Sequence, residues 1–113
     1  MKEGNIVLAE LPQVTGTPKG RPVVVLRQMP GYGDFLVCGL SSQIRQYLPG
    51  FDEVLFPDST NGLRVTSVVR LGFIDVLPAA QFFGQLGIIP DSLLGTLRTR
   101  LVDCIVGPRS ETV

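Results

Sequence analysis

The sequence has no histidine and no tryptophan, and it has only two cysteines among its 113 residues. Without histidine there is no Ser-His-Asp triad, no histidine acid–base pair and no zinc site with an imidazole ligand. Cys38 and Cys104 lie far apart, each in an apolar segment with no second cysteine nearby, so neither fits a metal knuckle or a redox motif. We expect both thiols to be buried.

An excess of either charge is also missing, because ten Lys and Arg residues are balanced by ten Asp and Glu residues. This balance excludes a polycationic arm, so any contact with nucleic acid must be local. Eight of the ten cations are Arg, the residue best suited to bidentate contacts with phosphate. No apolar run reaches the roughly 18 residues that a membrane span needs, and no charged-then-apolar leader begins the chain. We therefore expect a cytoplasmic protein that does not bind membranes.

Short apolar, β-prone runs separated by turn residues dominate the first two thirds of the chain, which contains many of its 13 Gly and nine Pro residues. A polar loop without a carboxylate is expected over residues 13–20, and Asn61-Gly62 is a strong turn signal. Gly72, inside the longest run, predicts a bend or bulge. The predicted strands cover residues 5–11, 21–26, 35–40, 53–56 and 66–76.

Helical patterns appear in three places. Residues 41–48 predict a capped helical turn, and the three- and four-residue spacing of apolar side chains over residues 79–87 predicts a short helix. After Pro90, residues 91–106 predict an amphipathic helix whose apolar face carries Leu94, Leu97, Leu101 and Ile105. The pattern indicates a mainly β protein, a small SH3-like or OB-like β-barrel with added helices, forming one domain over residues 1–107 with a short tail at 108–113.

Several stretches, in this order and spacing, resemble the MazF/PemK family of toxins, and the resemblance covers almost the whole chain. They are Gly-Asn-Ile-Val-Leu-Ala-Glu-Leu-Pro at 4–12, Lys-Gly-Arg-Pro-Val-Val-Val-Leu at 19–26, Leu-Ser-Ser-Gln at 40–43, Gly-Leu at 62–63, Ser-Val-Val-Arg-Leu at 67–71, and Leu-Gly at 86–87 before a Leu-rich helix. The resemblance implies an SH3-like barrel of the MazF/PemK/CcdB type with a C-terminal α-helix.

The resemblance also implies a function: a homodimeric endoribonuclease toxin of a type II toxin-antitoxin system that cleaves single-stranded RNA without a metal or other cofactor and is inhibited by a cognate antitoxin. The family's catalytic Arg falls on Arg21, and its catalytic Thr falls on Ser41, which keeps the hydroxyl group. This sequence departs from the family pattern at residues 73–75, where Phe-Ile-Asp replaces a Gln-Ile-Arg-like segment. The candidate RNA contacts are Lys19, Arg27, Ser42, Gln43, Arg64 and Arg70.

RNA cleavage needs no metal if the substrate's own 2′-hydroxyl attacks the neighbouring phosphorus, which leaves a 2′,3′-cyclic phosphate and a 5′-hydroxyl. Arg21 suits the task of stabilising the charge on the phosphoryl oxygens, and Ser41 suits that of holding one of them. The sequence does not single out a general base. The candidates are Glu10, Asp34 and Asp75.

Each of these residues also has a structural interpretation. Arg21 fits a surface residue at the start of a strand that pairs with a carboxylate, Ser41 and Ser42 fit helix caps, and the other cations fit a solvated surface. At the level of function, the alternative is a catalytically weak or inactive family member that acts as an antitoxin-binding, regulatory module. A peptide-binding SH3 module and a stacking RNA chaperone fit less well, because aromatic residues are few and lack an interleaved basic pattern.

Overall fold

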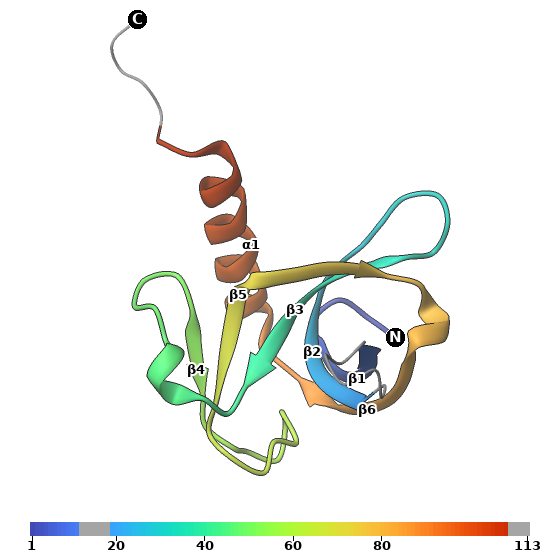
Figure 1. The fold of residues 1–113 in the computed structure, drawn as a ribbon, viewed down its shortest axis with the longest axis horizontal. Helices are drawn as coiled ribbons and strands as arrows, with labels where there is room; N and C mark the ends of the chain where they lie inside the picture. The colour runs from blue at the N-terminus through green and yellow to red at the C-terminus, as the bar shows by residue number, and fades with distance from the viewer. Residues whose placement is uncertain (12–18, 109–113) are drawn as a thin grey trace, which may run out of the picture.

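Six antiparallel strands form one curled sheet in the computed structural model, which describes residues 1–11 and 19–108. The sheet order is β4-β5-β3-β2-β1-β6, and in Figure 1 the sheet curls into an open barrel with helix α1 (Asp91–Val106) standing at one side. The mainly β fold with a C-terminal helix is thus confirmed. The strands are β1 (Asn5–Leu11), β2 (Lys19–Gln28), β3 (Phe35–Ser41), β4 (Glu53–Leu55), β5 (Ser67–Leu77) and β6 (Phe82–Ile88).

Strand β2 is buried on both faces, which explains its continuous apolar run. Val24 and Leu26 point into a core that includes the helix residues Leu94, Leu97 and Leu101. Val23 and Val25 point the other way, into a second cluster with β1 and β3 residues. A strand covered on both faces has no polar side to present, so its sequence does not alternate.

The predicted irregularity at Gly72 is confirmed as a wide bulge in β5. Gly39 of β3 pairs with Arg70, whereas the preceding Cys38 pairs with Ile74, so residues 71–73 have no partner in β3. The bulge bends β5, whose first part pairs with β4 and whose second part continues along β3. As a result, Phe73 is turned onto Gly39, where an added Cβ would lie 3.5 Å from the Phe73 Cβ.

The helix predicted over residues 79–87 is wrong. A 3₁₀ turn at Ala79–Gln81 leads directly into β6, which pairs antiparallel with β1 and closes the curl of the sheet. Pairing with an otherwise open strand edge outweighs the helical spacing of the apolar residues. Position 87 of this strand has no room for a side chain, because an added Cβ there would lie 2.3 Å from the Thr60 carbonyl oxygen.

The remaining helical predictions are confirmed in part. The turn over 41–48 is a single 3₁₀ turn at Ile44–Gln46, without a side-chain cap, and the last helix has its expected bounds. Cys38 is buried, and burial raises the pKa of its thiol to about 12. Cys104 and Ile105 are exposed, contrary to expectation, because the final turns of α1 extend beyond the sheet (Figure 1). Of the helices in the described part of the chain, none is long and apolar enough to cross a membrane.

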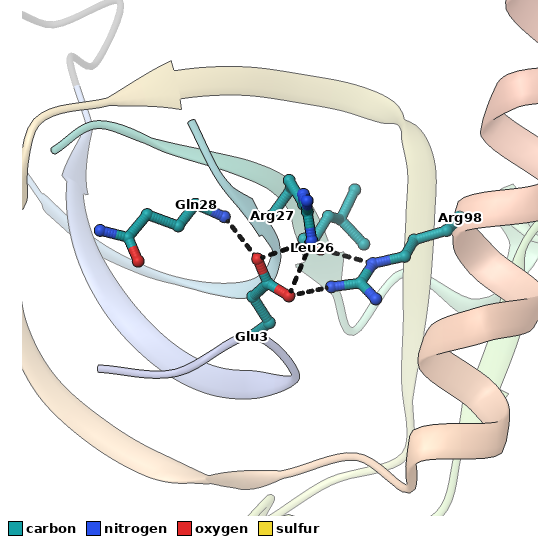
Figure 2. A network of polar contacts seen from close by, with 5 residues as sticks. All are labelled: Glu3, Leu26, Arg27, Gln28 and Arg98. Carbon is teal, nitrogen blue, oxygen red and sulfur yellow. Dashed lines mark hydrogen bonds and ion pairs between the residues drawn. The ribbon is translucent and has the colours of Figure 1, made fainter. Parts of the chain in front are cut away.

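A carboxylate-centred network fastens the N-terminal segment to β2 and α1 (Figure 2). Glu3 accepts hydrogen bonds from the Gln28 backbone N–H at 2.9 Å and from the Arg98 guanidinium, and Arg27 lies at 3.5 Å. The Arg98 Nε also donates to the Leu26 carbonyl oxygen at 2.8 Å. The Gln28 N–H is the main reason why the pKa of Glu3 lies below 4.5; partial burial raises this pKa, and the two arginines lower it further.

A Glu3→Gln variant is expected to melt a few degrees below the wild-type chain at neutral pH. Because folding lowers the pKa of Glu3, its stabilising effect is present above about pH 4.5 and is lost as the pH falls through the folded-state pKa. Melting curves recorded at pH 7 and near pH 3 test this, with the exposed Glu10→Gln as control. A difference between Glu3→Gln and wild type that is equally large at both pH values would contradict the expectation.

Candidate functional site

A cleft of about 960 Å³ opens where the start of β2 lies beside the end of β3. Its walls come from these two strands, from residues 62–65, from the bulged part of β5 and from β6. In the described part of the chain, five of the eight residues predicted as catalytic groups or RNA contacts line it together: Arg21, Ser41, Ser42, Gln43 and Arg64.

The register between β2 and β3 brings the two candidate catalytic residues to the same end of the cleft. Val23 pairs with Gly39 in an antiparallel ladder, so two residues earlier in β2 and two later in β3 the same register reaches Arg21 and Ser41. Arg21 is exposed, while Ser41 is half-buried and its Oγ accepts the Gln43 N–H at 3.0 Å. Within the described residues the Ser41 O–H donates to no other group, so it is available to donate to a ligand.

Residues 62–65 of the lining follow a loop whose conformation is held by hydrogen bonds to the side chains of Asp58 and Asn61. Asp58 Oδ1 accepts the N–H groups of Thr60 and Asn61 at 2.8 and 2.6 Å, and the Oδ1 of buried Asn61 accepts the Leu63 N–H at 3.0 Å. Gly62 has φ +67°, and an added Cβ would lie 2.0 Å from the Leu86 carbonyl oxygen. The predicted Asn61-Gly62 turn is confirmed, and it sets Arg64 at the edge of the cleft.

The bulged part of β5 contributes an aromatic ring and a carboxylate. Phe73 and Asp75 both line the cleft, and Arg70 stacks on Phe73 with its guanidinium carbon 4.1 Å from the ring centre. Arg70 is held in turn by the buried carboxylate of Asp52, at 3.6 Å, and by a hydrogen bond to Gln46. Arg70 therefore holds the Phe73 ring in place without lining the cleft itself.

Arg27 and Arg70, which were also predicted as RNA contacts, do not line the cleft. Arg27 is outside the cleft and pairs with Glu3. Lys19 begins β2 opposite Leu11. Of the three candidate bases, Asp75 is the one that lines the cleft within the described residues. The predicted loop over residues 13–20 falls outside the described residues except for its last two positions, as does the tail beyond residue 108.

The role of Phe73 at the cleft was not recognised from the sequence. An aromatic side chain directly after a glycine inside a strand was the available signal, because a bulge there redirects the side chain. Among residues 1–11 and 19–108, no three His, Cys, Asp or Glu side chains lie close enough together to hold a metal ion. The chemical groups that the cleft offers are guanidinium, hydroxyl, amide, aromatic and carboxylate.

The curled sheet, its C-terminal helix and the Arg21–Ser41 cleft define a small SH3-like barrel with a cleft that combines apolar walls with several polar side chains. The family model of the PemK-like, MazF-like toxin of type II toxin-antitoxin systems matches residues 2–105. The chain therefore belongs to this toxin family, whose members are generally endoribonucleases.

Solved structures agree with this fold. The chain is similar to the Mycobacterium tuberculosis toxin MazF-mt6, with 23% identity, a TM-score of 0.63, and coverage of 86% of this chain and 91% of the other. It resembles an endoribonuclease in complex with its cognate antitoxin from a mycobacterial species, with 17% identity and a TM-score of 0.71. This match covers 97% of this chain and 99% of the other. It also resembles the MazE-MazF complex of Deinococcus radiodurans, with 20% identity and a TM-score of 0.72. This match covers 94% of this chain and 96% of the other. No curated protein sequence matches the chain.

Proposed function

We propose that this chain is an endoribonuclease toxin that cleaves single-stranded RNA by metal-independent attack of the substrate's 2′-hydroxyl. The observation that supports this most strongly is the presence of Arg21 and Ser41 in one cleft of a chain that belongs to the MazF-like toxin family. The cleft also carries Arg64, Ser42 and Gln43, which suit contacts with the RNA backbone.

In the proposed reaction, the 2′-oxygen forms a bond to phosphorus while the bond from phosphorus to the 5′-oxygen breaks. The 2′-hydroxyl loses one proton and the leaving 5′-oxygen gains one, so the proton count is unchanged. Arg21 donates its paired N–H groups to the phosphoryl oxygens, where negative charge builds up. Ser41 donates its O–H to one of these oxygens, while its Oγ continues to accept the Gln43 N–H, which holds the hydroxyl group in place.

We further propose a homodimeric, cytoplasmic toxin that is inhibited when a cognate antitoxin covers this cleft. Two of the similar solved structures are complexes with an antitoxin, which supports a partner of this kind. The second candidate function is a weak or inactive toxin that serves as an antitoxin-binding module. Asp75 favours that alternative, because a carboxylate in the cleft opposes the attraction of the two arginines for RNA.

The test is to incubate the purified chain with a long single-stranded RNA in excess chelator and to map the fragment ends. Discrete cuts with 2′,3′-cyclic phosphate and 5′-hydroxyl ends are expected, at the same positions with and without added Mg²⁺. Intact RNA after incubation with folded, antitoxin-free protein would favour the binding module. Cuts that appear only with a divalent metal would contradict the proposed chemistry.

A further inference from the structure

Phe73 presents an exposed aromatic ring inside the cleft although it belongs to a strand. Its side chain is 61% exposed, and it lines the same cleft as Ser41. Arg70 covers part of the ring at 4.1 Å, and Asp52 and Gln46 hold Arg70 in place. The ring is therefore held in one orientation before any ligand binds, and its uncovered part faces the cleft. An aromatic surface of this kind is what unpaired bases stack on.

Asp75 lies beside this ring on the same face of the sheet. Asp75 pairs with Val37, and Phe73 packs on Gly39, two residues further along β3, so both side chains share the face of Val37 and Gly39. Two residues of a strand span roughly 6.6 Å, about the distance from the centre of a stacked base to a partner at its edge. The Asp75 Oδ1 accepts the Val76 N–H at 2.8 Å, and within the described residues this exposed carboxylate makes no other hydrogen bond or ion pair.

The charge of Asp75 decides which part of an RNA strand passes over it. A phosphate group beside a carboxylate is repelled, whereas Arg21 and Arg64 elsewhere in the cleft attract it. The backbone therefore follows the arginines, and a base is the part that reaches Phe73 and Asp75. A carboxylate only accepts hydrogen bonds, so it selects a base edge made of donors.

Guanine alone offers two adjacent donors, N1–H and N2–H, on its Watson–Crick edge; in adenine, cytosine and uracil an acceptor atom would face the carboxylate. We propose that Phe73 and Asp75 form a guanine-binding subsite, in which the base stacks on Phe73 and its N1–H and N2–H groups donate to the Asp75 carboxylate. This inference rests on the proposed function, since it assigns part of the sequence preference of the same cleft.

The test measures binding without cleavage. A random pool of 2′-fluoro RNA lacks the attacking hydroxyl, so the wild-type chain is mixed with this pool, and the bound molecules are recovered and sequenced. Guanine is expected to predominate at one position, close to the roughly fourfold enrichment that is the maximum for one of four equally frequent bases. Replacing that guanine by inosine, which lacks the N2 amino group, is expected to weaken binding of the selected RNA several-fold.

Two variants separate the contributions of the pair. Asp75→Asn keeps the size of the side chain but mixes a donor with an acceptor, so the guanine preference should disappear; Asp34→Asn, outside the cleft, should keep it. Phe73→Leu should weaken binding about tenfold for selected sequences through lost stacking. Phe56→Leu removes an aromatic ring that is 71% exposed and outside the cleft, so it should bind as wild type.

The results distinguish this subsite from the function as a whole. Bound RNA without guanine enrichment, or an enrichment that survives Asp75→Asn, would overturn the guanine subsite, while RNA cleavage in chelator would still support the endoribonuclease. If no RNA binds and none is cut, both the subsite and the proposed function are wrong.

Discussion

The Arg21→Ala variant is expected to cleave single-stranded RNA about 10²- to 10³-fold more slowly than the wild-type chain. Arg21 lies in the cleft with Ser41, and in the proposed reaction it supplies paired donors to phosphoryl oxygens whose charge grows as the 2′-oxygen attacks. A single-turnover assay with excess protein measures the rate of this step directly. Because Arg21 is exposed, the substitution should leave the melting temperature nearly unchanged.

The matched variants show whether position or charge matters. Arg21→Lys keeps the charge but loses the planar pair of donors, so it should recover only part of the rate. Arg27→Ala removes the same side chain outside the cleft, where it pairs with Glu3, and should cleave at nearly the wild-type rate. An Arg21→Ala protein that cleaves as fast as Arg27→Ala would show that Arg21 is not part of the reaction.

The second large effect is expected from Asp52→Ala, which should lower the free energy of unfolding by about 3 kcal/mol. Asp52 is 1% exposed, and its two carboxylate oxygens accept the backbone N–H groups of Leu71 and Leu48, both at 3.1 Å. Its loss leaves these donors unpaired and removes the carboxylate partner of the mostly buried Arg70. Urea unfolding followed by circular dichroism measures the difference.

Asp91→Ala provides the comparison for Asp52, because it removes an exposed carboxylate at the start of α1. This substitution should lower the free energy of unfolding by less than about 1 kcal/mol. Similar free energies of unfolding for the two variants would contradict the role assigned to Asp52. Since Asp52 holds Arg70, and Arg70 stacks on Phe73, the Asp52→Ala protein that remains folded should also bind RNA more weakly.

The sequence predicts most of the strands because their signals are local. The apolar runs of β1 and β3, the β-branched run of β2 and the leucines of α1 each specify their element within a few residues. The run at residues 82–88 does not specify a strand by itself. Its partner β1 lies far away in the sequence, and the strand forms only when the sheet closes. Likewise, no local sequence signal shows that the last turns of α1 extend beyond the sheet. Cys104 was therefore expected to be buried, although it is exposed.

For the site, the resemblance supplied Arg21 and Ser41, and the sheet register explains how residues so far apart in sequence line one cleft. The grouping of Phe73 with Asp75 beside them could not be predicted, because it depends on the length of the β5 bulge and on its pairing with Gly39 and Val37. Arg27 and Arg70 look like equivalent surface cations in the sequence. Their carboxylate partners, Glu3 and Asp52, are what separate their roles.

The most direct test of the central claim is to remove the attacking group from the substrate. Once the cut positions are known, an RNA with a single 2′-deoxynucleotide immediately 5′ of the scissile phosphate is incubated with the wild-type chain in excess chelator. If the substrate's own 2′-hydroxyl is the nucleophile, this RNA is bound but stays intact, while the all-ribose RNA yields 2′,3′-cyclic phosphate ends. Cleavage of the deoxy-substituted RNA at the same bond would show that water or a side chain attacks instead, and would contradict the proposed mechanism.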